Sequence, residues 1–502
     1  MSRKRVQLVT AGLMLSLFLA SMESTVVSTA SPTIVGQLGG LETYSWVFTA
    51  FMVASTTTVP IFGKLSDLFG RRPTYAAALG IFLAGSLLCG AAQSMGQLIA
   101  FRLIQGLGAG GLLPLVFTII GELFTLEQRA RMQGLFSGVW GISAIVGPLL
   151  GGFLVDQVSW RWVFFINIPF GLVAGALVWF AWVDRQRPMG AARPAIDWAG
   201  VGLLSLGVVL LMLALLDIRQ PLGWGLLAAA VICVAALLWV ERRAADPVLP
   251  LPLFRDRVFA VACVHGVLAG CALFGSASFV PLFAQAVLGT SATGAGAVLA
   301  PMLIGWVISS IVGGRLLLRL PYRVLTLGGT ALLALGSLFV ARIDAGTSRI
   351  ALGTALALMG IGMGLCVPAF LIAVQSAVRR RDMGSATSTM QFSRSIGSVI
   401  GVSVMGAVLS IILTSRLAAA GLDVTLVDRL LSPEGATTAT AQLEGAVRAA
   451  LASAIRGAFV VALIASLSAL AVTLLTPGGR IGQLERRPDE PDAAPTPVVT
   501  GD

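Results

Sequence analysis

Four charged or titratable side chains lie within stretches of sequence that are otherwise apolar: Glu23, Arg102, His265 and Arg394. A charge near the middle of a lipid bilayer costs several kcal/mol unless it is paired or hydrated. A carboxylate in such a place can take up and release a proton, and a nearby guanidinium favours its ionised form. An imidazole can change charge near physiological pH. These residue types therefore indicate proton movement and ion pairing in an apolar setting.

Glu23 and Arg102 are predicted to lie at similar depths. At about 1.5 Å per residue, Glu23 lies about 22 Å above the start of its apolar run and about 8 Å below its outer edge. Arg102 follows the start of another run by about five residues. We expect Glu23 to take up a proton from the outer side of the membrane and to release it on the inner side, with Arg102 holding Glu23 ionised when the two side chains are close. The alternative is a static pair that fixes the register of two helices.

The composition explains how such residues are positioned. The chain of 502 residues is 57% hydrophobic and 11% charged, with a mean hydropathy of +0.91, whereas soluble domains carry about 25% charged residues. A transmembrane helix needs about 20 apolar residues. We therefore predict an all-α polytopic membrane protein whose fourteen spans lie near 8–31, 44–64, 74–93, 97–121, 133–155, 162–183, 197–217, 222–240, 258–283, 292–314, 324–342, 350–376, 386–412 and 452–476.

The basic residues predict the orientation of these spans. Most of the 34 Lys and Arg residues fall in the segments that share a side with the N-terminus, so both termini are expected in the cytoplasm. The net charge of +11 thus reflects topology and does not indicate a nucleic-acid partner.

The five cysteines form no CxxC pair, and the sequence has neither a GxxxxGK[ST] loop nor an HExxH motif. We therefore expect no metal, no cofactor and no enzymatic activity.

Short charged linkers divide the chain into unequal parts. We expect a six-helix bundle at 1–184, a two-helix insert with its linkers at 185–257, a second six-helix bundle at 258–476 and a disordered cytoplasmic tail at 477–502. Small residues four apart allow helices to approach closely. Such pairs recur in the fifth span of each outer block, at Gly147 and Gly151 and at Gly397 and Gly401. This recurrence suggests two related halves.

Residues 63–73 read GKLSDLFGRRP and resemble the GxLxDxxGRR signature of the major facilitator superfamily. Gly63 and Gly70 suit a tight turn and close helix contact. Asp67 can cap a neighbouring helix or pair with an arginine such as Arg71 or Arg72. We expect these groups to form a latch at an inner gate. The second half has a degenerate copy, GGRLLLRLPYR at 313–323, in which Leu318 replaces the acid.

Residues 134–152 read GLFSGVWGISAIVGPLLGG and are similar to the antiporter motif that marks exporters within this superfamily. Pro148 should bend the helix. The small residues would give a smooth face on which another helix can move. The motif positions are Gly134, Ser143, Gly147, Pro148, Gly151 and Gly152.

Three further runs resemble the fourteen-span drug:proton antiporters of the superfamily: ESTVVSTASP at 23–32, WVFTA at 46–50 and WRWVFFINIP at 160–169. The run RLIQGLG at 102–108 resembles the family's RxxQGxG motif, which implies a role for Arg102 in proton coupling. The resemblance implies a proton-coupled antiporter of the inner membrane, with two six-helix bundles and two extra central helices, that exports small amphipathic drugs. Its partners would be substrate, protons and lipid, and it would act as a monomer.

The substrate remains open at this stage. One alternative is a dedicated exporter of one metabolite, such as an antibiotic, a siderophore or a lipid precursor, and a more remote one is a channel or receptor. A channel would be expected to repeat polar pore-lining residues, and no such pattern is present. The candidates for lining a substrate cavity are Gln105, Trp140, His265, Met363, Gln391 and Arg394.

Overall fold

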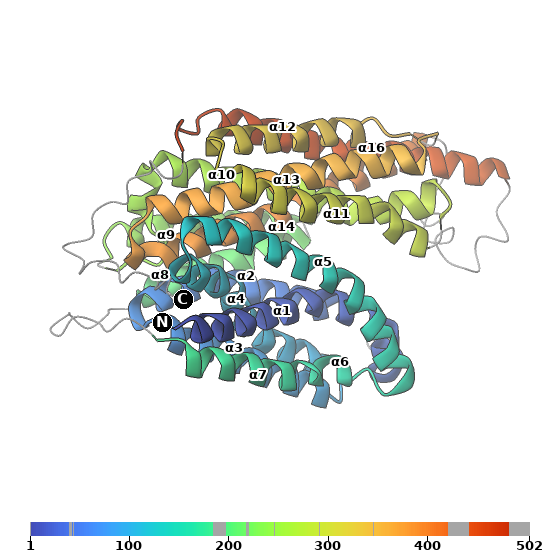
Figure 1. Ribbon diagram of the computed structural model, residues 1–502. Helices are drawn as coiled ribbons and strands as arrows, with labels where there is room; N and C mark the ends of the chain where they lie inside the picture. Colours follow the sequence, from blue (N-terminus) through green and yellow to red (C-terminus); the bar gives the residue numbers. More distant parts are fainter. Residues whose placement is uncertain are drawn as a thin grey trace.

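The protein is built almost entirely of long helices (Figure 1). The computed structural model describes residues 2–39, 43, 45–183, 197–216, 220–244, 246–290, 292–344, 346–419 and 441–480, and this part of the chain contains no β-strand. Its first block of helices comprises α1 (Arg3–Leu38), α2 (Ser45–Phe69), α3 (Arg71–Ala91), α4 (Met95–Leu123), α5 (Leu126–Gln157), α6 (Trp162–Phe165) and α7 (Asn167–Ala181).

A central hairpin and a second block follow. The hairpin consists of α8 (Trp198–Leu216) and α9 (Pro221–Glu241). The second block contains a short 3-10 turn η2 (Leu251–Arg255), α10 (Arg257–Leu282), a π turn η3 (Phe283–Val287), α11 (Ala292–Leu316), α12 (Tyr322–Val340), α13 (Arg349–Ala377), a 3-10 turn η4 (Arg380–Asp382), α14 (Met383–Ala419) and α16 (Ala441–Thr473).

Length and composition make these helices membrane spans. Thirteen of the described helical segments are long and apolar enough to cross a bilayer, with α6 and α7 counted as one span. The remaining predicted span, near 133–155, corresponds to α5, which is absent from that set but packs along α1 and α11. Backbone groups have no water to bond within lipid, so only structures that satisfy their own hydrogen bonds can cross it. The prediction of an all-α polytopic membrane protein is confirmed.

The two blocks have separate apolar cores. Buried side chains of α1, α3, α4 and α7 form clusters within the first block. Side chains of α10, α12, α13, α14 and α16 form the largest cluster in the second. In Figure 1 the first block occupies the lower part of the view and the second block the upper part.

The two blocks also repeat their packing. In the first, α5 lies along α1, and in the second α14 lies along α10. Gly397 and Gly401 bring α14 so close to α10 that a Cβ on either glycine would strike the backbone of Val267 or Cys271. Between the blocks, α2 packs against α14 and α5 against α11. The structure is therefore two six-helix halves with the hairpin added.

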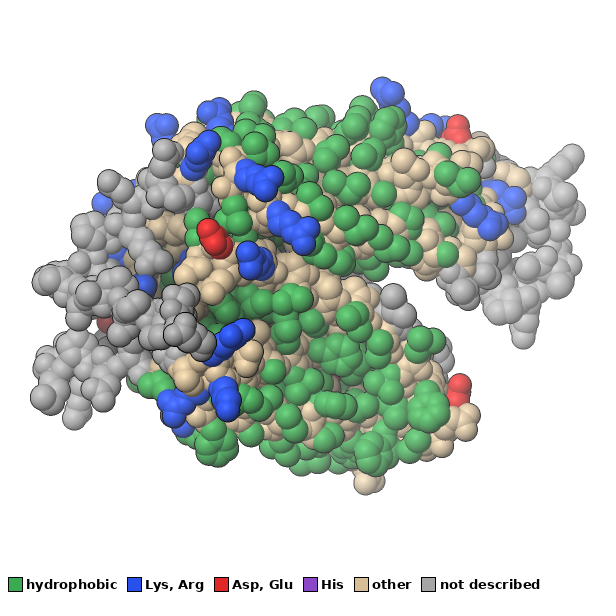
Figure 2. All heavy atoms as spheres, in the orientation of Figure 1, with side chains coloured by type: hydrophobic (Ala, Val, Ile, Leu, Met, Phe, Trp, Pro, Cys, Tyr) green, Lys and Arg blue, Asp and Glu red, His purple; other side chains and the backbone are tan. Residues whose placement is uncertain are grey.

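The halves meet on one side of the molecule and separate on the other. We call the side on which α1 begins and α16 ends the near face, and the opposite side the far face. Hydrogen bonds join the halves from the near face inward, including Gln375 Nε2 to the Phe117 carbonyl (3.2 Å) and Ser137 Oγ to Ser310 Oγ (2.7 Å). Figure 2 shows a hollow between the two halves that opens at the far face, on the right of the view. We call this hollow the cleft.

The halves meet along two seams, the contact of α2 with α14 and the contact of α5 with α11. The central hairpin covers the α2–α14 seam. Leu204, Val208 and Met212 of α8 form an apolar cluster with Val53 of α2, and Phe392 and Ile396 of α14 pack against it. The hairpin therefore packs on the same two helices that meet between the halves on this side.

Some predicted features fall outside the described residues. These are the linker at 184–196 and the tail from 481 onward. The domain boundaries and the disordered tail thus stay predictions.

The close approach of α14 to α10 gives a test of this packing. The substitution Gly397→Val should destabilise the protein by about 1–3 kcal/mol, because overpacking forces the helices apart. Gly406 of the same helix has only one atom, of the Phe279 ring, 3.5 Å from an added Cβ, so Gly406→Val is the matched control. Thermal denaturation in detergent should show a lower midpoint for Gly397→Val than for the control. Equal midpoints would contradict the packing.

Candidate functional site

An ion pair lies deep within the first half. Arg102 Nη1 of α4 is 2.5 Å from Glu23 Oε1 of α1. The two side chains are 1% and 2% exposed, respectively. The pair therefore lies in a low-dielectric interior where charge-assisted hydrogen bonds are strong. The structure thus brings together the two residues that the sequence placed at similar depths.

Two amide side chains complete the coordination of the carboxylate. Gln105 Nε2 donates to Glu23 Oε1 (3.0 Å), and Asn167 Nδ2 of α7 donates to Glu23 Oε2 (2.9 Å). Both amides also donate to Ser86 Oγ of α3, at 2.8 Å and 3.3 Å. We call these five residues, Glu23, Arg102, Gln105, Asn167 and Ser86, the carboxylate network.

Two further N–H groups of the guanidinium are also used. Arg102 Nη1 donates to Gln105 Oε1 (2.7 Å), and Nε donates to the Val47 carbonyl of α2 (3.1 Å). The guanidinium carbon lies 4.2 Å from the centre of the Phe51 ring, also on α2. Contacts from α2 therefore hold Arg102 in place independently of Glu23.

Sequence reasoning found only part of this network. Gln105, a predicted cavity residue, is fully buried and bonded to Glu23 and Arg102. Asn167 and Ser86 were not among the predicted site residues, although Asn167 lies in the family-like run at 160–169. The available signal was an amide side chain inside an apolar span, which needs a buried partner.

A second charged cluster closes the near face. Arg71 at the start of α3 donates to Asp67 at the end of α2 (2.5 Å) and to Glu122 at the end of α4 (2.6 Å). Its Nη2 also reaches the carbonyl of Arg380 in the second half (3.4 Å). The guanidinium therefore links three elements of the near face.

Asp67 extends from the first half to the start of α14. Its carboxylate accepts the backbone N–H groups of Gly384 (2.9 Å) and Ser385 (2.7 Å) and the hydroxyl of Ser385 (2.6 Å). The N-terminus of a helix carries unpaired N–H groups and a partial positive charge, so it favours an anion. Asp67 thus makes both of the contacts that its motif allows, a helix cap and a pair with arginine. We call Asp67, Arg71, Glu122 and Ser385 the latch.

The motif glycines shape this contact. A Cβ on Gly63 would strike Ser388 of α14, so the crossing of α2 and α14 requires glycine. Gly70 has φ 96°, a backbone conformation that suits glycine. Arg72 lies outside the latch, with its guanidinium carbon 4.1 Å from the centre of the Trp179 ring.

The degenerate copy in the second half packs without a carboxylate. Gly314 approaches the backbone of Ala130 in α5, which matches the approach of Gly63 to α14. Leu318 stands where Asp67 stands in the first copy, and it is exposed. The second copy of the motif therefore offers no carboxylate to match the contact that Asp67 makes between α2 and α14.

The antiporter-like motif forms two contact surfaces on α5. Gly134 approaches Ile311 of α11, whereas Gly147 and Gly151 approach Thr25, Val26 and Thr29 of α1. Ser143 Oγ accepts a hydrogen bond from Ser21 Oγ of α1 (2.6 Å). Gly152 has open space around it, and the side chain of Pro148 lies outside the described residues.

The other predicted cavity residues fall into two groups. His265 and Met363 are buried within the second half, and His265 Nε2 lies 3.0 Å from Thr330 Oγ1. Trp140 is 44% exposed, whereas Gln391 and Arg394 are partly exposed. In this conformation only the second group presents accessible side-chain surface.

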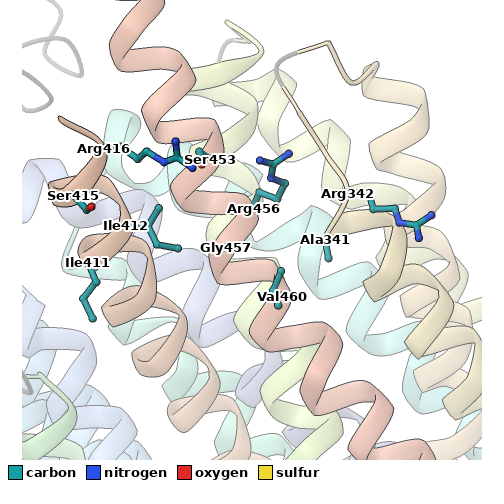
Figure 3. A pocket seen from close by; sticks show the side chains of 10 residues that line it. All are labelled: Ala341, Arg342, Ile411, Ile412, Ser415, Arg416, Ser453, Arg456, Gly457 and Val460. Atoms are coloured by element: carbon teal, nitrogen blue, oxygen red, sulfur yellow. The ribbon is translucent and has the colours of Figure 1, made fainter. Parts of the chain in front are cut away.

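A separate pocket lies at the far-face ends of α14 and α16 beside the residues that follow α12 (Figure 3). Its volume is about 700 Å³, and its lining includes Arg342, Arg416 and Arg456. All three arginines are exposed. No group of three or more potential metal ligands occurs among the described residues.

These features define a class of membrane protein. Two six-helix halves enclose a cleft that is closed at one face by a charged latch, and a buried carboxylate lies beside it in the first half. The family model of the Major Facilitator Superfamily matches residues 13–402. The chain belongs to the Major Facilitator Superfamily, as the sequence motifs indicate.

Curated relatives cover most of the chain. It is 38% identical over 454 residues to the "Multidrug transporter protein MdtP" of Bacillus subtilis (strain 168), which spans 88% of this chain and 82% of that protein. It is also 38% identical over 415 residues to "Multidrug resistance protein 3" of the same strain (82% and 80% of the two chains). The "Efflux pump dotC" of Dothistroma septosporum is 33% identical over 405 residues (78% and 68%).

Solved structures share the fold. The human organic anion transporter MFSD10 superposes with a TM-score of 0.63 at 15% identity, covering 93% of this chain and 99% of that one. The proton:xylose symporter XylE superposes with a TM-score of 0.61 at 12% identity, covering 96% and 98%.

The latch can be tested by measuring the distance between the halves. The substitution Asp67→Asn removes the ion pair with Arg71 and weakens the cap on α14. Spin labels on exposed near-face positions, Glu127 in α5 and Arg319 after α11, should then show a shift toward longer distances. Asp246→Asn is the control, because Asp246 is partly exposed and, within the part of the chain that the structure describes, its one ion pair is with Lys64 at 3.5 Å. A distance distribution that Asp67→Asn leaves unchanged would contradict the latch.

Proposed function

We propose that this protein exports small amphipathic compounds in exchange for protons, with Glu23 as the proton carrier and Arg102 as its counter-ion. The observation that carries this proposal is the carboxylate network, a fully paired acid inside a membrane-spanning half. The names of the two Bacillus subtilis relatives support the class of substrate.

The contacts of Glu23 suggest how protonation would act. A protonated Glu23 no longer attracts the guanidinium of Arg102 as an ion, and its new O–H must find an acceptor. Arg102 would keep the Val47 carbonyl, Gln105 and the Phe51 ring. The free energy that holds α1 against α4 would therefore depend on whether Glu23 carries a proton.

The position of α1 connects this chemistry to the cleft. The helix presents Glu23 to α4 and α7, and it presents Ser21 and Thr25 to the small-residue surface of α5. A helix that packs on glycines can shift without large steric barriers. A change in the charge of Glu23 could thus move α1 along α5 and alter how the halves meet.

We place the near face in the cytoplasm of a bacterial cell, because the basic residues gather in the segments on that side. The structure would then be an outward-open state, in which the latch closes the inner gate. We further propose that the protein works in the inner membrane as a monomer, without a cofactor or a nucleic-acid partner.

A dedicated exporter of one metabolite is the second candidate. The "Acurin A biosynthesis cluster MFS-type transporter" of Aspergillus aculeatus, 31% identical over 406 residues (78% of this chain and 73% of that protein), has a name of this kind. The two candidates differ in how many unrelated compounds the protein moves.

The proposal predicts the result of a transport assay. In proteoliposomes, a pH gradient should drive accumulation of a cationic dye by the parent protein, and Glu23→Gln should abolish this dependence on the gradient because Gln cannot carry the proton. Asp156→Asn is the control, since Asp156 is an exposed acid at the far end of α5.

Gradient-driven transport at the parental rate in Glu23→Gln would contradict the role of Glu23. A parent that moves no dye but moves one metabolite with the gradient would favour the dedicated exporter. The thermal midpoint of each variant in detergent separates loss of transport from loss of folding.

A further inference from the structure

Arg394 differs from Arg102 in the way its charge is balanced. It lies eleven residues beyond the first residue of α14, about 16 Å into the span from the near face. Arg102 has Glu23 as its partner, whereas Arg394 has neither an ion pair nor a hydrogen bond to its side chain among the described residues.

The sequence offers no carboxylate near Arg394. Helices α10, α11, α12, α13 and α14 contain no Asp or Glu, and the only acid in α16 is Glu444, four residues from its far-face start. Glu23, the acid deep in the first half, is already bonded by Arg102, Gln105 and Asn167. A cation at this depth without a partner carries a large free-energy cost, so such residues usually serve a function.

The packing of α14 shows which way Arg394 faces. At 3.6 residues per turn, Gly397 and Gly401 face α10, and Gly384 faces α2 of the other half. Phe392 and Ile396 face the hairpin. The backbone of Arg394 lies against Gly270 at the edge of the α10 side, and by helical spacing its side chain leaves α14 between the α10 side and the α2 side.

The neighbours of Arg394 are consistent with a place in the cleft. Gln391 and Ser398, which lie within one turn of it on this side of α14, are partly exposed, as is Arg394 itself. On α5 of the other half, Leu135, Ile142 and Leu149 form an exposed apolar side, and Trp140 projects from the opposite side of the helix. One side of α14 therefore carries a cation with polar groups beside it, and α5 of the other half presents an exposed indole ring.

We propose that Arg394 is a binding residue for the anionic group of the substrate, so that the cargo includes amphipathic organic anions such as aromatic carboxylates. A guanidinium presents a planar fork of donors that suits a carboxylate, a sulfonate or a phosphate. The aromatic body of such a compound can pack against the apolar walls of the cleft and Trp140. This inference rests on the proposed function, because it assigns the class of compound that the transporter carries.

The test uses two fluorescent probes with the same aromatic body and opposite charges. These are 1-pyrenebutyrate and its trimethylammonium analogue, with the neutral alcohol 1-pyrenebutanol as a third probe. Binding to the full chain in detergent is measured by fluorescence anisotropy for the parent, Arg394→Gln and Arg394→Lys. Arg416→Gln is the matched control, because Arg416 lies on the same helix at the exposed far-face pocket (Figure 3).

We expect the parent to bind the anion more tightly than the alcohol. Arg394→Gln should weaken binding of the anion at least about tenfold, since it removes a charge-assisted contact, and should not weaken binding of the cation. Arg394→Lys, which keeps the charge but loses the planar fork of donors, should retain only part of the anion binding, and Arg416→Gln should leave all three dissociation constants unchanged.

Two results would overturn the proposal. One is a parent that shows no preference for the anion over the alcohol, a measurement that needs no variant to fold. The other is an equal loss of all three probes in Arg394→Gln, which would indicate a structural role. Binding in detergent needs no proton gradient, so failure of gradient-driven dye transport would count against the proposed antiport and not against the assignment of Arg394.

Discussion

The ion pair between Glu23 and Arg102 is the interaction on which the first half depends. A carboxylate that is removed from water must be paired and hydrogen-bonded, or its burial becomes strongly unfavourable. The structure meets this requirement with groups from five helices: Glu23 from α1, the Val47 carbonyl from α2, Ser86 from α3, Arg102 and Gln105 from α4, and Asn167 from α7. Any change in the charge of Glu23 therefore alters contacts with most of the first half.

The same helix connects this network to the rest of the molecule. α1 packs on α5 through Thr25 and Gly147, and α5 packs on α11 of the second half through Gly134 and Ile311. On the other seam, the latch joins α2 to α14 and the central hairpin covers both helices. The two seams thus differ. One is a surface of small residues on which helices can shift, and the other is held by charges and covered by apolar side chains.

The sequence predicts the spans because each is a long apolar run. It also predicts the contacts of Asp67, because an acid beside arginines and a helix end can pair with an arginine or cap a helix. It does not predict the rotation of each helix about its axis, which tertiary packing decides. Gln105 was for this reason expected in the cavity, whereas it faces Glu23, and Asn167 was overlooked. His265 is buried against Thr330 for the same reason. The sequence shows that Arg394 is an unusual residue within an apolar span. The direction of its side chain follows only from the packing of α14, in which Gly397 contacts α10 and Phe392 contacts the hairpin.

In the proposed antiport, Glu23 exchanges a proton when substrate binds, and this exchange can be measured directly. The purified protein in weakly buffered detergent solution, with a pH-indicator dye, is mixed with a transported compound. The account predicts that binding releases protons from the parent chain in proportion to the bound compound, and that Glu23→Gln binds the compound without releasing any. Equal proton release from both proteins would contradict it, because another group would then carry the proton.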